Sequence, residues 1–411
     1  MIIKSIKLIQ FRNYRHQEIE VDPEINIFYG ENAQGKTNIL EAIYLCACAR
    51  SHRTSRDSDL ILHDTHDYAV CIRYLSQQKV EETLEIRYLE AIPSDPQRTR
   101  SLRHIFHNGL KLDKISDLMG LFHAVIFAPE DLMLIKEGPA TRRRYLDLLI
   151  SQVRPAYFVH LQQYARILAQ RNRLLKTWRD QRKSGKKGID ETIAVQLDVW
   201  NESLAREAAA VLSIRQAFCE RISSLAMEAQ QLISDQSEIL EVRYRSVPGI
   251  ETSSSTEEIY DQYLRKLKRN LEDDIEKGIT QAGPHRDDLE LTLNGNAIKP
   301  FASQGQQRSA VLSLKIAELQ ILREDTGETP VFLLDDVMSE LDENRRISLL
   351  KNIQDAQVFV TCTDAHHVQL DFSEKMCDTA DKQPCQRKQS LYCVHQGRVT
   401  RQSEDGQCDG L

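Results

Sequence analysis

The chain has 411 residues, a formal net charge of −7 and a hydrophobic fraction of 41%. A chain of this length usually needs more than one hydrophobic core, and its ordinary composition excludes wholesale disorder. No run of about 18 or more apolar residues occurs, so we expect no membrane span. Nine cysteines at irregular spacings, with no signal peptide, are typical of an intracellular protein. We therefore expect a cytoplasmic protein with at least two lobes.

A phosphate-binding loop is the first motif with a chemical meaning. The segment GENAQGKT, residues 30–37, fits the pattern G-x-x-x-x-G-K-[ST]. It lies between INIFYG, typical of a short apolar strand, and NILEAIYLCACA, typical of an apolar helix. In that order of elements, backbone N–H groups surround phosphate oxygens. We predict that the whole loop binds a nucleotide, through Gly30, Glu31, Asn32, Ala33, Gln34, Gly35, Lys36 and Thr37.

Two side chains of this loop have specific expected roles. Lys36 is expected to reach the β- and γ-phosphates and to act in catalysis, and the Thr37 hydroxyl is expected to ligate Mg²⁺. Glu31 and Gln34 are open to a second interpretation, in which they only fill the loop.

The middle of the chain predicts a helical insertion. Two apolar series have heptad spacing, one from Tyr157 to Trp178 and one from Leu204 to Leu232, and the polar segment KSGKKGID separates them. This pattern predicts an antiparallel hairpin packed like a short coiled coil, with arms of some 25 residues and a length of roughly 40 Å. An ordinary helical subdomain folded onto the core is the open alternative. The Asn-Gly pairs in HNGLKL and LTLNGNAI predict β-hairpins on either side.

The first helix of this insertion is basic. Residues 141–190 contain 13 Lys or Arg and 3 Asp or Glu, so the remainder of the chain carries −17. A basic surface on an acidic body is typical of a nucleic-acid contact. If this helix runs along a phosphate backbone, Arg171, Arg173, Lys176 and Arg179 are the expected contacts. A solvated helical face is the alternative.

A polar loop and a helix start follow the insertion. The loop QAGPHRDD, residues 281–288, has two open interpretations. In one, His285 and Arg286 face phosphate, and in the other, Arg286 pairs internally with Asp287 or Asp288. The segment FASQGQQRS, residues 301–309, gathers small polar groups directly before a long apolar helical run. Because the first N–H groups of a helix are unpaired, this helix start is predicted to bind an anion.

A carboxylate partner for the phosphate loop occurs in TPVFLLDDVMSELD, residues 329–342. The apolar strand VFLL ends at Asp335 and Asp336, where a buried parallel strand carries its functional residues. Asp335 is expected to hold Mg²⁺ through water, and Asp336 to orient or deprotonate the attacking water as a catalytic residue. Helix capping by the two aspartates is the alternative. VFVTCTD and LYCVHQGRV predict further strands, and the polar tail 400–411 is predicted to be disordered.

Taken together, the motifs resemble the ATPase heads of the ABC and SMC classes, and more closely the bacterial RecF family. The resemblance covers almost the whole chain, through FRNY, GENAQGKTN, SHRTSRD, FAPEDL, RRRYLD, QAGPHRDDL, SQGQQRS, LLDDVMSELD and VTCTD. It implies an α/β P-loop ATPase head with mixed sheets and an inserted, mainly helical lobe. The expected divisions are an N-terminal ATPase segment (residues 1–140), the arm lobe (141–280), a C-terminal ATPase segment (281–399) and the tail (400–411).

The resemblance also implies a mechanism and partners. The signature residues Ser303, Gln304, Gly305 and Gln306 would contact the γ-phosphate of ATP held by a second copy, giving an ATP-dependent homodimer. The expected activity is a weak, DNA-stimulated ATPase that binds gapped DNA or single–double-strand junctions. It would act in DNA repair and replication restart, helping RecR and RecO to load recombinase.

Some features of that class are not plain in this sequence. FAPEDL is the candidate for the glutamine loop, and Thr361, Thr363 or His366 is the candidate for the switch histidine. The competing functions are an ABC-type ATPase subunit of a transporter and a small-molecule P-loop kinase. A kinase would not need the signature segment, and a transporter subunit would not need a basic heptad hairpin.

Overall fold

The computed structural model describes residues 1–76, 78–92, 95, 98–184, 191–234, 236–374 and 387–402. The chain divides into two compact units. The first unit contains Met1–Leu132, Glu228–Ser237 and Gln304–Leu411, and the second contains Met133–Met227 and Glu238–Ser303. Most of the predicted turn at 183–190 and of the predicted tail at 400–411 lies outside the described residues.

An antiparallel sheet forms one layer of the first unit, in the order β2-β1-β4-β5-β6-β7. Its strands are β1 (Ile2–Phe11), β2 (Tyr14–Glu20), β4 (Asp67–Leu75), β5 (Glu81–Leu89), β6 (Leu102–His107) and β7 (Leu110–Leu112). Buried residues alternate with more exposed ones along β4, as expected for a strand with one face on the core. The predicted HNGLKL hairpin joins β6 and β7, with Asn108 and Gly109 both at positive φ.

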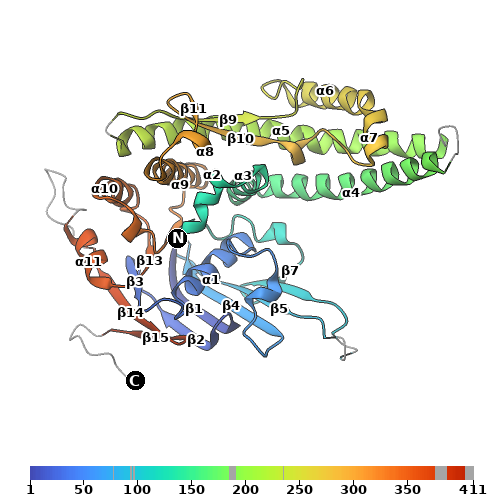
Figure 1. The fold of residues 1–411 in the computed structure, drawn as a ribbon. Coiled ribbons are helices and arrows are strands. Elements are labelled where there is room, and N and C mark those ends of the chain that lie inside the picture. The colour runs from blue at the N-terminus through green and yellow to red at the C-terminus, as the bar shows by residue number, and fades with distance from the viewer. Residues whose placement is uncertain are drawn as a thin grey trace. The chain divides into compact units, whose positions relative to one another are not determined.

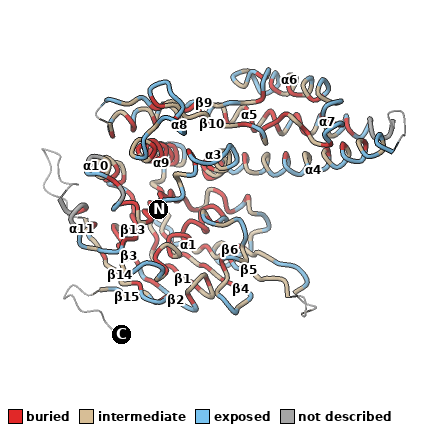
Figure 2. The backbone as a smooth tube through the Cα atoms, viewed as in Figure 1, coloured by how far each residue is buried: buried red, intermediate tan, exposed pale blue. Residues whose placement is uncertain are grey.

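A mostly parallel sheet forms the second layer, in the order β15-β14-β3-β13-β12-β8. Its strands are β3 (Ile25–Tyr29), β8 (Ala124–Phe127), β12 (Val331–Asp335), β13 (Val358–Cys362), β14 (Gln389–His395) and β15 (Arg398–Arg401). Strands β8, β12 and β13 are buried along their whole length, which explains their continuous apolar sequences. Of these strands, β13 is labelled in Figure 2, where buried residues are red. The first unit also contains α1 (Lys36–Cys48), α9 (Gln304–Thr326), α10 (Glu343–Asn352), α11 (Ala365–Glu374) and the short 3₁₀ turns η1 (Asp57–Leu60), η2 (Ile115–Asp117), η3 (Pro129–Leu132) and η5 (Met338–Glu340).

The second unit is mainly helical. Its helices are α2 (Met133–Lys136), α3 (Pro139–Val153), α4 (Pro155–Lys183), α5 (Glu191–Ile233, whose last residues belong to the first unit), α6 (Thr256–Arg269), α7 (Leu271–Lys277), the 3₁₀ turn η4 (Pro284–Arg286) and α8 (Ile298–Phe301). A small sheet, in the order β11-β10-β9, contains β9 (Leu240–Arg245), β10 (Asp288–Leu293) and β11 (Asn296–Ala297). Within the described residues, no helix is long and apolar enough to cross a bilayer.

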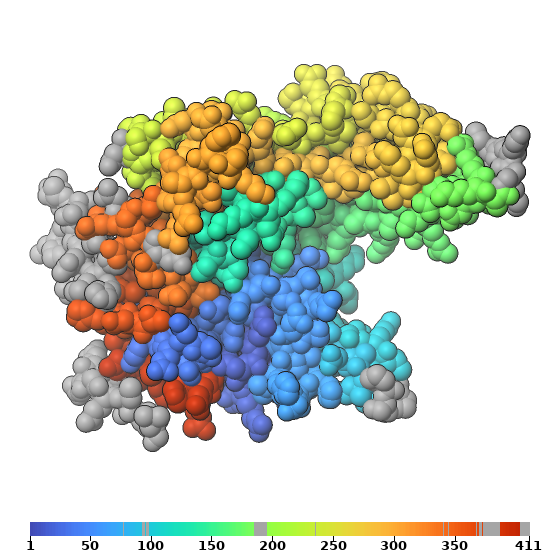
Figure 3. Space-filling view, viewed as in Figure 1, coloured from blue at the N-terminus to red at the C-terminus, as the bar shows by residue number. Residues whose placement is uncertain are grey.

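The two long helices of the predicted arm are present, side by side, as α4 and α5 (Figure 1). Their heptad positions do not form an isolated coiled coil, because further elements of the second unit cover them. Leu204 and Ala208 pack with Tyr263 and Leu267 of α6. Trp178 packs with Ile275 of α7, and the atoms of α6 and α7 lie against the α4–α5 pair in Figure 3. The insertion is therefore a helical subdomain with its own core.

The start of α6 shows how local sequence positions these helices. The Ser255 hydroxyl accepts a hydrogen bond from the Glu258 N–H, and the Glu258 carboxylate accepts one from the Ser255 N–H, at 3.3 Å and 3.0 Å. This capping box satisfies two N–H groups that would otherwise lack partners at the helix start. The buried residues Ile259, Tyr263 and Leu267 then repeat every four residues along one face.

The loop at residues 281–288 belongs to the second unit, whereas we predicted that it begins the C-terminal ATPase segment. The reason is that β10 pairs with β9 along its whole length. Asp287 pairs with the buried Arg215 at 3.1 Å, and Asp288 pairs with Arg142 at 2.7 Å. The two aspartates therefore pair with arginines from other helices, and Arg286 lies exposed.

His285 has a defined tautomer in this loop. Its Nε2 lies 3.1 Å from the Thr280 carbonyl oxygen, which can only accept, so Nε2 donates. Nδ1 therefore accepts from the Tyr164 hydroxyl, at 2.6 Å. Burial lowers the pKa of His285 from 6.5 to about 4, and the neighbouring Arg286 acts in the same direction.

We predict that His285 makes the folded state less stable in acid. A folded-state pKa below the unfolded value stabilises the protein above pH 6.5, and this contribution is lost progressively as the pH falls from 6.5 to about 4. His285→Gln keeps one donor and one acceptor but does not titrate. Between pH 7 and pH 4.5, wild type should lose about 2 to 3 kcal/mol more unfolding free energy than the variant, measured by urea denaturation.

Asp287, whose pKa burial raises to about 6, titrates in both proteins and so cancels from this comparison. Equal acid losses in the two proteins would contradict the prediction.

Candidate nucleotide-binding site

The phosphate loop has the backbone that its sequence predicts. It joins β3 to α1, and Gly30, Ala33 and Gly35 have φ of 149°, 65° and 115°. A Cβ at Gly35 would lie 2.6 Å from the Asn13 side chain and 2.9 Å from the Tyr14 hydroxyl. Only glycine therefore fits at this position without moving the FRNY segment.

Lys36 is folded over this loop. Its Nζ donates to the Gly30 and Glu31 carbonyl oxygens, at 2.6 Å and 2.8 Å. Burial lowers the pKa of Lys36, while Asp336 and Asp335 oppose that shift. The ammonium group is thus held at the centre of the loop, where it can exchange carbonyl oxygens for phosphate oxygens.

Asp335 lies next to Thr37, although 298 positions separate them in the chain. The Thr37 hydroxyl donates to Asp335 Oδ1 at 2.8 Å. The Thr361 hydroxyl, from β13, donates to the same oxygen at 2.7 Å. Burial raises the pKa of Asp335, and the two threonine hydrogen bonds limit the rise. The predicted metal ligands are therefore in direct contact.

Thr361 also holds the residue after Asp335. Its hydroxyl accepts from the Asp336 N–H at 3.0 Å. A backbone N–H can only donate, so the hydroxyl proton must point at Asp335. Asp336 has a φ of 54°, in the left-handed region that non-glycine residues rarely adopt. The Thr361 hydroxyl thus uses its donor on Asp335 and its acceptor on Asp336. The other two candidates for the switch position, Thr363 and His366, are exposed.

The FRNY segment braces the loop, a role that we did not assign from sequence. The Asn13 side chain donates to the Gln34 carbonyl at 2.8 Å, and the Tyr14 hydroxyl donates to the Gly35 carbonyl at 3.0 Å. Gln34 is also more than a loop filler, because its side-chain oxygen accepts from the Gln396 N–H at 2.7 Å. The turn between β14 and β15 is therefore fastened to the phosphate loop.

A buried carboxylate organises the segment SHRTSRD. Glu41 of α1 is fully buried and accepts two hydrogen bonds from Arg12, at 2.7 Å and 2.8 Å. It also accepts a hydrogen bond from the Ser51 hydroxyl. Burial opposes ionisation, but the Arg12 and Ser51 hydrogen bonds outweigh it and lower the pKa of Glu41. No sequence pattern indicates this role, since an acidic residue inside a helix is usually exposed.

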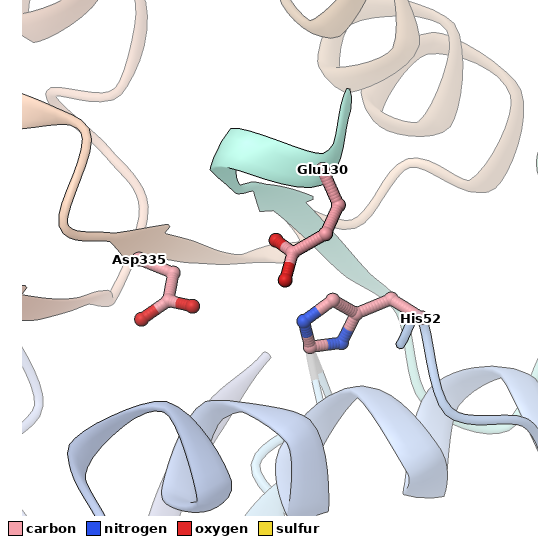
Figure 4. Close-up of side chains that lie close together, drawn as sticks. All are labelled: His52, Glu130 and Asp335. Atoms are coloured by element: carbon pink, nitrogen blue, oxygen red, sulfur yellow. The ribbon is translucent and has the colours of Figure 1, made fainter. Parts of the chain in front are cut away.

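Three potential metal ligands meet beside this network (Figure 4). His52, Glu130 and Asp335 each offer a ligand atom, and these atoms lie within 4.8 Å of one another. Burial raises the pKa of Glu130, and the nearby Asp335 adds to the shift. Arg53 lies 3.6 Å from the Glu130 carboxylate. The FAPEDL segment thus brings the Glu130 carboxylate next to Asp335.

The signature residues lie where the chain passes from the second unit into the first. Ser303 is the last residue of the second unit, and α9 starts with Gln304 in the first. Ser303 and Gln304 are exposed, and Gly305 and Gln306 are half-buried. A Cβ at Gly305 would lie 3.3 Å from the Arg345 guanidinium, which also donates to Ser309 at 2.7 Å.

The middle of α9 carries a buried ion network. Lys315 pairs with Asp131 at 3.2 Å and with Glu318 at 3.1 Å. This network links α9 to the FAPEDL segment.

The sequence and fold match known proteins along nearly the whole chain. Residues 2–385 match the family described as RecF/RecN/SMC N terminal domain. The DNA replication and repair protein RecF of Ruminiclostridium cellulolyticum is 42% identical over 367 residues, which cover 89% of this chain and 94% of the relative. The RecF of Acetivibrio thermocellus is 41% identical over 364 residues, covering 89% and 94%. The chain belongs to the RecF family.

Solved structures agree with this assignment. The structure described as the recombination mediator protein RecF-ATP in the RecFOR pathway has a TM-score of 0.82 and 34% identity, covering 98% of each chain. An Smc head domain derived from Pyrococcus furiosus has a TM-score of 0.50 and 15% identity, over 98% of this chain and 97% of that one, which supports the fold alone. The expected ABC/SMC-like α/β head with a helical insertion is confirmed. These matches give no support to the transporter alternative.

The structure corrects one of the DNA contacts predicted for this RecF-family chain. Arg171 has an exposed fraction of 0% and donates to Asp274, Thr280 and Asn201, at 2.8 Å, 2.6 Å and 2.8 Å. It is a core residue of the second unit and does not reach solvent, because the face of α4 that carries it is covered.

The other three predicted cations of α4 differ in exposure. Arg179 is half-buried and donates to the Lys277 carbonyl at 3.3 Å. Arg173 and Lys176 are exposed. These two side chains are the ones that a phosphate backbone could reach without rearrangement of the helix.

We predict that the Thr361 hydroxyl stabilises the fold by holding the two aspartates. Thr361→Val removes a donor to the buried Asp335 oxygen and an acceptor for the Asp336 N–H, so it should cost about 1 to 3 kcal/mol of unfolding free energy. Thr361→Ser keeps the hydroxyl and should lie within about 1 kcal/mol of wild type. Urea denaturation measures both. Equal losses in the two variants would show that the hydroxyl is not needed.

Proposed function

We propose that the protein is an ATP-dependent DNA-binding switch of recombinational repair and replication restart, which hydrolyses ATP slowly. The observation that carries this proposal is the hydrogen-bonded set of Thr37, Asp335 and Thr361 beside a fully formed phosphate loop. Family membership supports the rest, since the relatives are DNA replication and repair proteins and one solved relative is described with ATP. The family's role in DNA repair also supports a cytoplasmic site of action.

The loop residues 30–37 would surround the triphosphate, with Lys36 at the β- and γ-phosphates. The donor set of the Thr37 hydroxyl and the Asp335 carboxylate fits Mg²⁺, which prefers hard oxygen ligands. When bound, the ion would neutralise charge on the β- and γ-phosphates. Asp336, whose backbone is fixed by Thr361, would orient or deprotonate the attacking water.

The signature would act on a second copy. Ser303 and Gln304 are exposed at the start of a 23-residue helix, where N–H groups and the helix dipole favour an anion. A two-fold dimer would place each signature over the nucleotide of the other copy. Hydrolysis would then remove the bridging γ-phosphate and reset the dimer. Gapped DNA or single–double-strand junctions, with RecR and RecO, are the proposed partners in recombinase loading.

We predict that Ser303→Arg and Lys36→Met complement each other. Ser303→Arg puts a bulky cation where the partner's γ-phosphate would dock, so it should bind ATP but stay monomeric. Lys36→Met should lose ATP binding, ATP turnover and ATP-dependent DNA binding. In a 1:1 mixture, a heterodimer has one composite site with both defects and one with none, so association should partly return.

Light scattering at saturating ATP, with DNA present, measures each variant alone and in the mixture. Circular dichroism checks that both variants are folded. Full dimerisation of Ser303→Arg alone would contradict the proposed action on a second copy. Wild-type DNA affinity of Lys36→Met under ATP would contradict the coupling between nucleotide and DNA.

We also predict a salt signature for the exposed cations of α4. If Arg173 and Lys176 each contact a DNA phosphate, the double alanine variant should reduce the slope of log K against log salt by about 1.8 on duplex DNA, at about 0.9 per contact. ATP-dependent dimerisation should remain. Lys79→Ala with Lys111→Ala, two exposed cations on the first unit, is the charge-matched control. An unchanged slope in the α4 variant, or an equal change in the control, would show that these cations do not contact DNA phosphates and that this side of α4 is only a solvated face.

A further inference from the structure

We propose that His52, Glu130 and Asp335 form a divalent-cation site with an imidazole ligand, which binds Mn²⁺ before any nucleotide is present. This inference rests on the proposed function, because it assigns further ligands to the cation of the same nucleotide site. It goes beyond that function in two ways. It predicts a metal preference, and it predicts metal binding that does not depend on ATP.

The geometry of the three side chains suits one cation. Their ligand atoms all lie within 4.8 Å of one another, and Figure 4 shows the three side chains converging on one space. At bond lengths of roughly 2.0 to 2.4 Å, two donors of one cation lie about 3 Å apart when they are adjacent and about 4 to 4.8 Å apart when they are opposite, so at least some of these three atoms must move closer together. Small side-chain movements would therefore complete the site.

Strand pairing places the two carboxylates. Strands β8 and β12 are parallel neighbours, with Phe127 opposite Leu334, so the residues that follow them emerge at the same edge of the sheet. Asp335 is then fixed by the two threonine hydroxyls. Next to Glu130, Asp131 accepts from the Ala128 N–H at 2.8 Å and pairs with the buried Lys315 at 3.2 Å. The backbone that carries Glu130 is thus held from both sides.

The position of His52 is fixed by the hydrogen bonds of its neighbour and by a ring contact. The hydroxyl of its neighbour Ser51 donates to the buried Glu41 and accepts from the N–H groups of Arg53 and Thr54, at 3.0 Å and 3.1 Å. The His52 ring also packs edge-on against Tyr44, with 5.8 Å between ring centroids. The imidazole is therefore pre-positioned, which lowers the entropy cost of binding a metal.

Charge and ligand type favour Mn²⁺ over Mg²⁺ here. Two carboxylates lie close together, and the Arg53 guanidinium lies 3.6 Å from the Glu130 carboxylate. A divalent ion would neutralise both carboxylates at once. Imidazole is a good ligand for first-row transition metals, whereas Mg²⁺ prefers oxygen ligands and water.

Mn²⁺ titration of the full chain, followed by electron paramagnetic resonance without nucleotide, tests the site. Wild type should bind one Mn²⁺ that a tenfold excess of Mg²⁺ does not displace. Pulsed spectra of the bound ion should show coupling to ¹⁴N of an imidazole. His52→Gln should lose that coupling and weaken Mn²⁺ binding about tenfold or more, and Glu130→Gln should weaken binding while keeping the coupling.

Two controls separate this site from general effects and from ATP binding. His66→Gln alters another His–Glu pair of the first unit, in which His66 Nδ1 lies 3.3 Å from Glu90, and it should leave Mn²⁺ binding unchanged. Lys36→Met should lose ATP binding but keep the Mn²⁺ site with its ¹⁴N coupling. Loss of Mn²⁺ binding in Lys36→Met would overturn the nucleotide-independent site.

Absence of ¹⁴N coupling in wild type would overturn the imidazole ligand, as would unchanged Mn²⁺ affinity in His52→Gln. Failure of the Mn²⁺ site with normal ATP-dependent dimerisation would leave the proposed function intact. Loss of ATP-dependent dimerisation with a normal Mn²⁺ site would contradict the proposed function and leave the Mn²⁺ site intact.

Discussion

The parallel register of β3, β13, β12 and β8 is the constraint on which the candidate site depends. Parallel strands that share hydrogen bonds have their carboxyl ends at the same edge of the sheet. The phosphate loop after β3, Thr361 in β13, Asp335 in β12 and Glu130 after β8 therefore meet there. A slip of one residue in β12 would turn Asp335 to the other face and break its hydrogen bonds with both threonines.

Buried charges hold the loops around that edge. Glu41 is satisfied by Arg12 and Ser51, and Lys315 by Asp131 and Glu318. A buried charge without a partner costs several kcal/mol, so each of these networks is stable only with all of its members in place. These networks therefore tie down the segments that carry His52 and Glu130. The second unit uses the same device, with Arg171 on Asp274 and Arg215 on Asp147 and Asp287.

The groups proposed for nucleotide chemistry come from several separately braced segments. The FRNY turn and the β14–β15 turn hold Gln34, and Thr361 holds Asp335 and Asp336. The start of α9 is linked by Arg345 to the segment after Asp336, and its middle is linked by Lys315 to FAPEDL. Polar contacts thus connect the segments around Asp336 and Glu130 to α9, the helix that follows the proposed signature.

The sequence by itself determined the local features of the site. The phosphate loop and the Asp335–Asp336 pair were predictable because each depends on a short pattern of glycines, apolar strand residues and polar groups within about ten positions. The helical insertion was predictable from its heptads, although its packing was not. Family resemblance added the signature, which no local chemistry identifies as acting on a second copy.

Only the tertiary structure decided which side chains meet across long separations. The spacing of charges along α4 groups Arg171 with the other basic residues of the helix. It does not indicate that Arg171 is buried against Asp274, 103 positions later. The FAPEDL, SHRTSRD and VTCTD segments show no local sign that they converge, because strand order and register set their neighbours. Glu130, His52 and Thr361 acquire their surroundings only when β8, β12 and β13 pair, and that pairing depends on the burial of the whole sheet.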